Sequence, residues 1–334
     1  TVLLRSDRQA AACGSDEEGQ CRLPALAPGR GYEAVAAGHW HTVLLCRDGE
    51  AVARGLDNFG QCRVPPPPPG LRYVAAAAGT FHTALLRSDG HAVGCGLNDQ
   101  GQCDFPALPP GGRYVQVAAG AFHTALLRDD GEVVACGQND QGQRAIPPLP
   151  PGQRYAAVAV GNLHTVLLRS DRQAAACGSD EEGQCRLPAL APGRGYEAVA
   201  AGHWHTVLLC RDGEAVARGL DNFGQCRVPP PPPGLRYVAA AAGTFHTALL
   251  RSDGHAVGCG LNDQGQCDFP ALPPGGRYVQ VAAGAFHTAL LRDDGEVVAC
   301  GQNDQGQRAI PPLPPGQRYA AVAVGNLHTV LLRS

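Results

Sequence analysis

Residues 117–143 read VAAGAFHTALLRDDGEVVACGQNDQGQ, a segment that contains most of a repeated unit. Variants of it recur every 41 residues, giving units 1–41, 42–82, 83–123 and 124–164 and then an identical copy of these four over 165–328. Residues 329–334 begin a ninth, partial unit with the same six letters as residues 1–6. A repeat of this length predicts units that bury their apolar sides only against their neighbours, as in a propeller or a solenoid. We therefore expect residues 1–334 to form a single repeat domain.

Each unit contains short apolar segments bounded by turn-forming residues. In the third unit and the segment leading into it, they cover residues 73–79, 82–87, 91–96 and 102–106. Segments of this length are typical of β-strands, and the Asp89-Gly90 pair is typical of a tight hairpin. The sequence predicts an all-β fold, a β-propeller of eight blades with about four short antiparallel strands in each. The alternative is an open superhelical array of the same blades.

Three further features assign places to these segments. The first strand of each set is rich in alanine and glycine, as in residues 75–79, which predicts that it is innermost, where a closed ring is most crowded. Proline-rich links such as residues 147–152 predict extended connectors. The first unit has Asp7-Arg8 where the others have Asp-Gly, so we expect its hairpin to be the most strained or the loosest.

The pattern V-A-A-G-x-x-H-T-x-L-L-x-x-D-G-x-x-x-x-x-G-x-N-x-x-G-Q over residues 117–143 resembles the regulator of chromosome condensation repeat. In length and in its Gly-Gln-x-x-x-Pro ending, the unit is similar to the short form found in a secreted bacterial β-lactamase inhibitor propeller. The resemblance implies a β-propeller, usually of seven blades. The tryptophan that often precedes the glycine of the third strand is replaced here by Cys13, Arg54, Cys95 or Cys136, and there are eight units.

One histidine recurs just before the second strand of every unit. Imidazole is a common metal ligand, but histidines on separate blades are expected to lie too far apart to share one ion. We therefore predict packed histidines that hydrogen-bond to backbone, and no metal site. The eight residues are His41, His82, His123, His164, His205, His246, His287 and His328.

The chain has 14 cysteines, seven in each half, and their spacing supports no common pairing rule and no CxxC zinc motif. We interpret them as small buried hydrophobic residues in a reducing compartment, which favours a cytoplasmic location. The chain begins with no basic segment followed by a hydrophobic stretch, so no signal peptide is expected. No apolar run approaches the roughly 20 residues that a membrane helix needs, so no membrane partner is expected.

Nearly every polar residue recurs four or eight times, whereas a catalytic site is asymmetric. We therefore predict no enzyme activity and no cofactor. The exchange-factor and ultraviolet-sensing functions of related propellers depend, by the resemblance, on inserted loops and on tryptophan clusters that this chain lacks. A net charge of −3 with interspersed signs offers no basic stripe, so nucleic acid is not the expected partner.

The two residues before each recurring histidine vary between units, and several are aromatic, which is typical of interface anchors in loops. The resemblance implies a binding role for this loop, because the matching loop forms part of the binding surface in the inhibitor propeller. The alternative is that the bulky residues only fill the seams between blades. The predicted partner-binding residues are His39, Trp40, Thr80, Phe81, Phe122, Asn162, His203, Trp204, Thr244, Phe245, Phe286 and Asn326.

Two hypotheses of function follow. The first is a non-enzymatic scaffold for protein–protein interaction that presents this variable aromatic rim to a protein partner. The second is a structural or filament-forming repeat array that self-associates through its strand edges. In a closed ring, residues 329–334 would compete with the identical residues 1–6 for one position, so only one of the two hexapeptides is expected within the ring.

Overall fold

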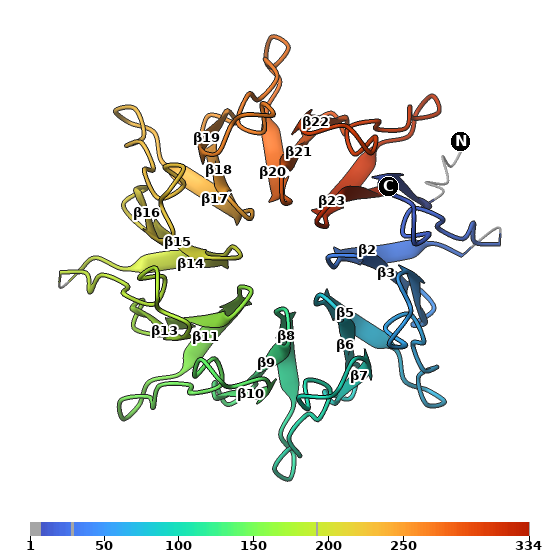
Figure 1. The fold of residues 1–334 in the computed structure, drawn as a ribbon, viewed down its shortest axis with the longest axis vertical. Helices are drawn as coiled ribbons and strands as arrows, with labels where there is room; N and C mark the ends of the chain where they lie inside the picture. The colour runs from blue at the N-terminus through green and yellow to red at the C-terminus, as the bar shows by residue number, and fades with distance from the viewer. Residues whose placement is uncertain (1–7, 28–29, 192, 334) are drawn as a thin grey trace, which may run out of the picture.

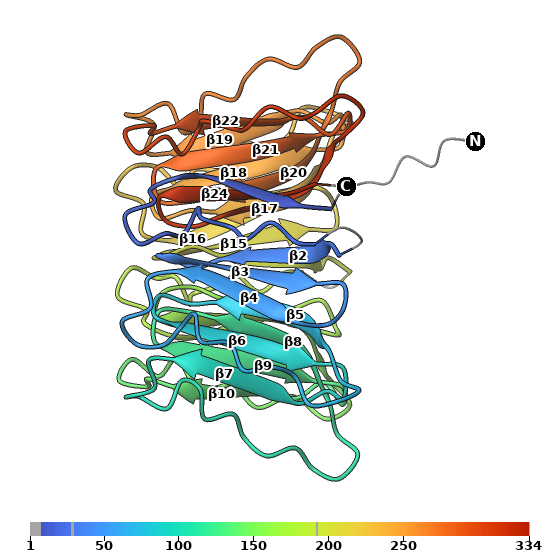
Figure 2. The same ribbon diagram turned by 90° about the vertical axis from the view of Figure 1, so that its right-hand side faces the viewer.

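The computed structural model describes residues 8–27, 30–191 and 193–333, which form eight three-stranded sheets around a central axis (Figure 1). The predicted eight-bladed, all-β propeller is confirmed. Figure 2 shows the ring as a disc whose strands run roughly along the axis, so that the connecting loops gather on two opposite faces. Within the described ranges, no helix is long and apolar enough to cross a membrane.

Each sheet has an inner, a middle and an outer strand in that order. The inner strands begin at a tyrosine: β2 (Tyr32–Ala37), β5 (Tyr73–Ala78), β8 (Tyr114–Ala119), β11 (Tyr155–Val160), β14 (Tyr196–Ala201), β17 (Tyr237–Ala242), β20 (Tyr278–Ala283) and β23 (Tyr319–Val324). The middle strands begin at a histidine: β3 (His41–Cys46), β6 (His82–Arg87), β9 (His123–Arg128), β12 (His164–Arg169), β15 (His205–Cys210), β18 (His246–Arg251), β21 (His287–Arg292) and β24 (His328–Arg333). The outer strands end at a glycine: β1 (Ala10–Gly14), β4 (Ala51–Gly55), β7 (Ala92–Gly96), β10 (Val133–Gly137), β13 (Ala174–Gly178), β16 (Ala215–Gly219), β19 (Ala256–Gly260) and β22 (Val297–Gly301).

The small strands are innermost, as the sequence predicts (Figure 1). Gly38, which follows β2, shows how tightly they pack, since a Cβ atom there would lie 2.5 Å from the carbonyl oxygen of Gly79 in the next blade. The same contact recurs around the ring until a Cβ on Gly325 would lie 2.4 Å from the carbonyl oxygen of Gly38. A side chain at this position would push adjacent blades apart, so the ring needs glycine there.

The middle strands are buried on both faces. In β3, Val43 and Leu45 pack with Tyr73 and Leu85 of the next blade, whereas Leu44 packs against the preceding blade. A strand covered on both sides reads as a continuous apolar run and not as an alternating pattern, which explains the recurring His-Thr-x-Leu-Leu sequence. Every core cluster is therefore shared between two blades, and an isolated blade has no core of its own.

A belt of hydrogen bonds joins the blades where the middle strands begin. Nε2 of His41 lies 2.8 Å from the hydroxyl oxygen of Thr83 in the next blade, and that hydroxyl donates to the Gln61 carbonyl oxygen at 2.8 Å. Because the hydroxyl has only one proton to donate, Nε2 must donate to it. The eight bonds are His41–Thr83, His82–Thr124, His123–Thr165, His164–Thr206, His205–Thr247, His246–Thr288, His287–Thr329 and His328–Thr42.

This belt corrects the prediction that these histidines bond to backbone, because each imidazole reaches across the seam to a threonine hydroxyl instead. The backbone of the entry turn is already used, since the Gly38 amide donates to the His41 carbonyl oxygen at 2.8 Å. Burial lowers the pKa of His82 to about 4 and that of His123 to about 3, so the belt is neutral at pH 7.

Strands from both ends of the chain close the ring. β1 pairs with β24, and β24 pairs with β23, in a sheet like the other seven. Val330 and Leu332 of β24 pack with Tyr32 and Leu44 of the neighbouring blade. Residues 329–333 thus hold the position for which the two identical hexapeptides were expected to compete, while residues 1–7 lie outside the described residues. The sequence predicts a closed ring or, as the alternative, an open array, and the structure has the closed ring.

The fourth predicted segment of each blade does not join the sheet, so a blade has three strands and an extended connector. In residues 102–106, the Phe105 amide donates to the Cys103 carbonyl oxygen, and Pro106 has no amide hydrogen to give a ladder. The Pro106 carbonyl oxygen accepts a hydrogen bond of 2.8 Å from the hydroxyl of Tyr114, at the start of the next inner strand. The connector is therefore anchored by a side chain rather than by strand pairing.

Each hairpin turn between a middle and an outer strand packs against the residue that precedes the next inner strand. Gly49 has a φ of 95°, and a Cβ atom there would lie 2.1 Å from Cβ of Arg72. In the Asp-Arg turns the sizes are exchanged: Arg172 has a φ of 66° and faces Gly195. Arg8 and Arg172 are the only non-glycine residues with positive φ in the described part of the chain, which confirms the predicted strain.

Candidate protein-binding face

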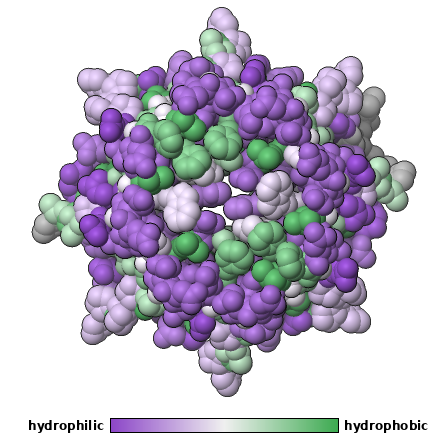
Figure 3. Space-filling model, in the orientation of Figure 1, coloured by the Kyte–Doolittle hydropathy of each residue, from purple (hydrophilic) through white to green (hydrophobic). Residues whose placement is uncertain are grey.

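One face of the disc combines the loops that precede the middle strands with the loops that follow the outer strands. The Leu56 amide donates to the Trp40 carbonyl oxygen at 3.0 Å, so the two kinds of loop lie side by side. The hairpin turns lie on the opposite face. Figure 3 shows the first face, where hydrophobic surface forms two groups on opposite sides of the axial opening. We call it the loop face, and all twelve predicted partner-binding residues lie in its loops.

Phenylalanine side chains on the loop face form two equivalent clusters. The ring of Phe59 meets the ring of Phe81 edge-on, with centroids 5.4 Å apart, and Phe81 lies 6.0 Å from Phe122. We call these three residues the first aromatic cluster. The second aromatic cluster is its copy, made by Phe223, Phe245 and Phe286 at 5.4 and 5.9 Å.

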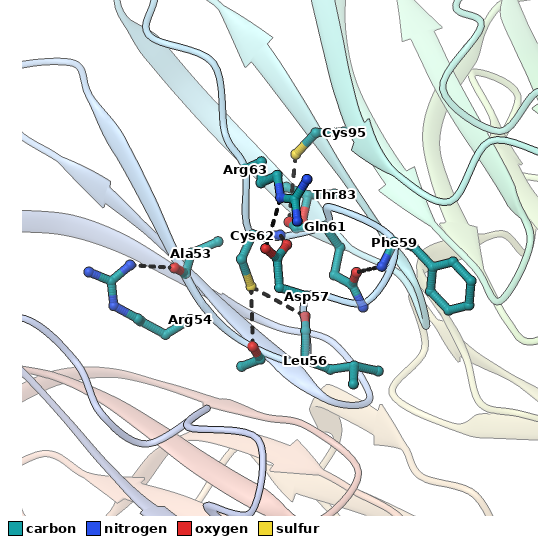
Figure 4. Close-up of polar contacts among 11 residues, drawn as sticks. Ala53, Arg54, Leu56, Asp57, Phe59, Gln61, Cys62, Arg63, Thr83 and Cys95 are labelled. Carbon is teal, nitrogen blue, oxygen red and sulfur yellow. Dashed lines mark hydrogen bonds and ion pairs between the residues drawn. The ribbon is translucent and has the colours of Figure 1, made fainter.

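Phe59 is 48% exposed, and its loop is held rigid by polar contacts within it (Figure 4). The Asp57 carboxylate accepts hydrogen bonds from the Cys62 amide at 2.9 Å and from Nε of Arg63 at 3.0 Å. The Phe59 amide donates to the side-chain oxygen of Gln61 at 3.1 Å. Figure 4 shows the Phe59 ring pointing away from all of these contacts, so an apolar group is presented on an ordered support.

The sequence prediction did not include Phe59 or Phe223. The signal was present, because the same loop position is Glu18, Gln100 or Gln141 in the other units of the first half. An aromatic residue where related units have polar residues indicates an exposed hydrophobic group. The predicted set covers only the loop directly before the recurring histidine, whereas Phe59 and Phe223 lie in the loop that follows the outer strand.

The structure separates the predicted residues into different surroundings. Phe81 and Phe122 belong to the first aromatic cluster, and Trp40 is half-buried. Thr80 is buried, and Asn162 lines a cavity on the axis. The copies Trp204, Phe245, Phe286, Thr244 and Asn326 have equivalent places.

His39 and His203 come from opposite blades and meet across the axis. Their ring centroids lie 4.7 Å apart with an interplanar angle of 23°, so the two imidazoles stack. Nδ1 of His39 lies 3.1 Å from the hydroxyl oxygen of Thr80, and the copy pairs His203 with Thr244 at the same distance. Burial lowers the pKa of His39 to about 4 and that of His203 to about 3. Both rings are therefore neutral at pH 7.

The stacked histidines divide the axial opening into two small cavities. One, of about 150 Å³, is lined by backbone and small side chains of the blades from β5 to β14. The other, of about 70 Å³, lies on the side of β17, β20 and β23. Both include His39 and His203 in their walls, and neither wall includes a carboxylate, an arginine or a cysteine. The axis holds neutral polar groups and no catalytic constellation among the described residues that line it.

The sequence matches the family model of the regulator of chromosome condensation (RCC1) repeat over residues 32–61, 73–102, 114–143, 196–225, 237–266 and 278–307, more than half of the chain. The chain belongs to the RCC1 repeat family. These six RCC1 repeats contain both aromatic clusters, so the clusters are built on positions that the family pattern covers. No curated protein matches the sequence significantly.

Solved structures with RCC1-like propellers share the fold. Prp20p from Saccharomyces cerevisiae, described with its binding properties to Gsp1p and histones, is 19% identical, with 99% of this chain and 92% of that chain covered and a TM-score of 0.67. Human WBSCR16 is 17% identical, with 97% and 98% covered and a TM-score of 0.65. A structure of Kap60 bound to yeast RCC1 (Prp20) is 21% identical, with 78% and 80% covered and a TM-score of 0.62. At these identities the likeness shows the fold alone.

The RCC1 repeats of this chain place their cysteines at the seams or under the loops. All 14 are free thiols. In Figure 4, Sγ of Cys95 lies 3.6 Å from the carbonyl oxygen of Gln61 in the preceding blade, and Sγ of Cys62 lies 3.4 Å from that of Leu56. Burial raises the pKa of both thiols to about 12. Both thiols are therefore protonated at neutral pH. The predicted burial holds for six of the cysteines, whereas the other eight, Cys62 and Cys95 among them, are partly exposed.

The loop face carries more carboxylates than arginines. Its loops in the first half of the chain contain seven carboxylates, Asp16, Glu17, Glu18, Asp57, Asp99, Asp104 and Asp140, and three arginines, Arg22, Arg63 and Arg144. The second half repeats this set. Two of the acids are paired, Asp16 with Arg22 and Asp57 with Arg63. The surface around the aromatic clusters is therefore acidic, although the net charge of the whole chain is only −3.

Proposed function

We propose that the ring is a non-enzymatic scaffold whose protein partner binds the loop face. The observation that carries this proposal is the pair of aromatic clusters, each with one phenylalanine 48% exposed on a loop that is held by its own hydrogen bonds. A large exposed aromatic group on a rigid support can be buried by a partner at little entropic cost.

The clusters also indicate the chemistry of the partner. The apolar groups lie among loops that have an excess of carboxylates, so the complementary surface has apolar side chains surrounded by arginine or lysine. Because the two halves of the chain are identical, any contact made by the first cluster is available at the second. Two partner molecules, or the two subunits of a dimer, would fit the same ring.

Related structures support a scaffold. The Saccharomyces cerevisiae propeller is described as binding Gsp1p and histones and, in another structure, Kap60, all of which are proteins. The repetition of polar residues supports the absence of an enzyme activity, as argued from the sequence. The closed ring gives less support to the filament hypothesis, because the end strands pair with each other in the sheet formed by β1, β24 and β23.

Two variants test the proposal by separating binding from stability. Phe59→Ala with Phe223→Ala removes the exposed rings, and Trp40→Ala with Trp204→Ala removes the half-buried indoles. The expected loss of affinity for a partner isolated with the intact ring is about 2 kcal/mol or more, with an unchanged thermal midpoint for the phenylalanine variant. The tryptophan variant decides between an anchor, which lowers affinity, and a seam filler, which lowers the midpoint.

The matched control is Val115→Ala with Val279→Ala. These valines are 52% and 53% exposed and lie at the start of inner strands, toward the opposite face. A partner whose affinity falls equally for the valine and the phenylalanine variants would contradict a binding site on the loop face. A fallen midpoint in the phenylalanine variant with affinity intact would make those residues part of the core.

A further inference from the structure

We propose that the proline-rich connector between β4 and β5, with its copy, is a docking site for a protein domain of the SH3 type, which binds polyproline II helices in an aromatic-lined groove. We call residues 63–69, Arg-Val-Pro-Pro-Pro-Pro-Pro, the proline connector, and its copy is residues 227–233. Figure 1 shows the segment before β5 at the outer edge of the disc, projecting away from the axis. None of these residues belongs to an aromatic cluster, so the inference goes beyond the proposed function.

The sequence allows the proline connector little conformational freedom. Each proline fixes its own φ at about −65°, and each residue that precedes a proline is driven to the extended region. Residues 64–68 all precede a proline, so this stretch forms a polyproline II helix. The Pro65 carbonyl oxygen accepts a hydrogen bond of 2.9 Å from the Tyr73 hydroxyl, and the Pro68 carbonyl oxygen accepts one of 3.0 Å from the Leu71 amide. A partner therefore binds a segment that is already ordered.

The blade holds the proline connector by one edge and exposes another. A polyproline II helix has three residues per turn, so residues three apart lie on the same edge. Val64 and Pro67 share a half-buried edge, and Val64 packs into the core cluster shared with the next blade. Arg63, Pro66 and Pro69 share an edge on which all three residues are exposed. The PxxP motif that SH3 grooves bind consists of two prolines three residues apart, and Pro66 and Pro69 present it to solvent.

Arg63 adds a positive charge to the exposed edge. A groove that binds Arg-x-x-Pro-x-x-Pro supplies a carboxylate for the arginine, whose planar head suits bidentate pairing. The Arg63 side chain is 77% exposed, and its Nε donates to the Asp57 carboxylate at 3.0 Å. This bond uses only one of the several N–H groups of the guanidinium. Asp57 therefore orients the arginine and leaves donors for the carboxylate of a partner.

The other connectors of the first half lack this combination on the same edge. The residues that correspond to Arg63 and Pro66 before β2, β8 and β11 are Arg22 and Ala25, Asp104 and Ala107, and Ala145 and Pro148. Only the proline connector and its copy have both the arginine and the proline there, so two docking sites are expected in each ring.

The connector between β10 and β11 contains the same motif in its sequence, but the fold covers part of it. Residues 144–150 read RAIPPLP, with Arg144, Pro147 and Pro150 in the motif positions. The two aliphatic side chains of this segment pack against a core cluster, and Pro147 is half-buried. Nη1 of Arg144 donates to the Gly137 carbonyl oxygen at 2.9 Å. Sequence alone would select this segment, whereas exposure selects the proline connector.

The test is calorimetric titration of the intact ring with a panel of purified SH3 domains that bind Arg-x-x-Pro-x-x-Pro peptides. Two equivalent domains per ring are expected, because the copy has the same pattern of exposure. Arg63→Gln with Arg227→Gln should weaken binding by about tenfold or more. Binding should fall below detection in the variant that removes the exposed prolines, Pro66→Ala, Pro69→Ala, Pro230→Ala and Pro233→Ala.

Matched controls change connectors that have the same exposure or the same motif. Titration should be unchanged by Arg144→Gln with Arg308→Gln, and also by Pro148→Ala, Pro151→Ala, Pro312→Ala and Pro315→Ala, which alter prolines that are equally exposed. Phe59→Ala with Phe223→Ala should also leave SH3 binding unchanged. This last control separates the proline connector from the loop face, so that either site can fail without the other.

The proposal is overturned if no domain of the panel binds the intact ring, or if the proline variant keeps the affinity of the intact ring. It is also overturned if the Arg144 variant weakens binding as much as the Arg63 variant does. Pro69→Glu with Pro233→Glu, at the exposed end of each segment, replaces the proline variant if that variant fails to fold, and should also weaken binding.

Discussion

His39 and His41 are two residues apart, yet the chain uses them in opposite ways. His41 is one of eight equivalent residues, is fully buried, and donates across a seam to a threonine that every blade supplies. His39 has only one counterpart, His203, and it meets that copy at the axis. The belt is constant because each seam must be the same for the ring to close. The residues of the loop face can differ between units because ring closure does not depend on them.

The comparison shows where to look for function in a repeat protein. Residues common to all eight units build the identical seams between blades. Residues that differ between units are not needed for those seams and can serve another role. Phe59, Phe81 and Trp40 all belong to the second group. If this division holds, changes in the belt and changes in the loop face should have independent effects.

The largest expected effect is acid unfolding caused by the belt. The folded-state pKa of each belt histidine is lowered to about 3 or 4, whereas its value in the unfolded chain is near 6.5. Stability is therefore fully present above pH 6.5 and is lost as the pH falls toward 4, because the unfolded chain binds protons that the folded belt excludes. Each histidine contributes up to about 1.4 kcal/mol per pH unit. Thermal midpoints from pH 7.5 to 4 measure this.

His91→Ala with His255→Ala is the control for that series, since these exposed histidines lie on the opposite face and take no part in the belt. A midpoint that stays constant down to pH 4 would show that the belt titrates normally and is not held neutral by burial.

A fragment of residues 8–171 should dimerise. It contains β1 to β12, so it carries an outer strand at one end and an unpaired inner and middle strand at the other. Two copies can rebuild every seam and every sheet of the ring, because the halves have identical sequences. Light scattering should give twice the fragment mass. A stable monomer of this fragment would mean that an open half ring is tolerated, and that closure contributes little.

Removing one threonine hydroxyl from each region compares them directly. Thr124→Val leaves Nε2 of the buried His82 without an acceptor, which should cost about 1–3 kcal/mol of unfolding free energy. Thr80→Val removes the bond to His39, which adjoins a cavity that can hold water, and should cost less than about 1 kcal/mol. Urea unfolding measures both. Equal losses would mean that the axial histidines are as much a part of the fold as the belt.

The smallest expected effect concerns the exchanged residues at the hairpin turns. Gly195→Arg should destabilise the ring, because a Cβ at Gly195 would lie 2.5 Å from Cβ of Arg172. Adding Arg172→Gly should reverse the loss and exceed the native stability by about 1 kcal/mol, since glycine relieves the positive φ of 66°. Partner binding should be unaffected. If the two changes are additive in a double-mutant cycle, the residues do not pack as a pair.

The sequence predicted the features that depend on local pattern. Strand-length segments, the Asp-Gly turns, the small inner strand and the eight blades were all predicted from the repeat, which favoured a closed ring and left an open array as the alternative. The count of strands was not, because the extended segment ending at Pro106 has strand-like composition, and only its bonding shows that it stays outside the sheet.

Features that depend on contact between units were harder to predict. The bond from His41 to Thr83 joins residues on different blades, and nothing in a single unit reveals it. The first aromatic cluster takes Phe59 from one kind of loop and Phe81 from another, so comparing one loop alone found only part of it. The meeting of His39 with His203 depends on the number of blades, which the repeat count supplied but the site prediction did not use.

The glycines that touch near the axis help to set the number of blades in the ring. Each contact of the kind between Gly38 and Gly79 fixes the angle between neighbouring blades, and eight such angles complete one turn. A ring of seven or nine units would have an odd number of blades. No residue would then lie directly opposite its own copy. The parity of the ring is thus set by residues that have no side chain, and the pairing of His39 with His203 is inherited from it.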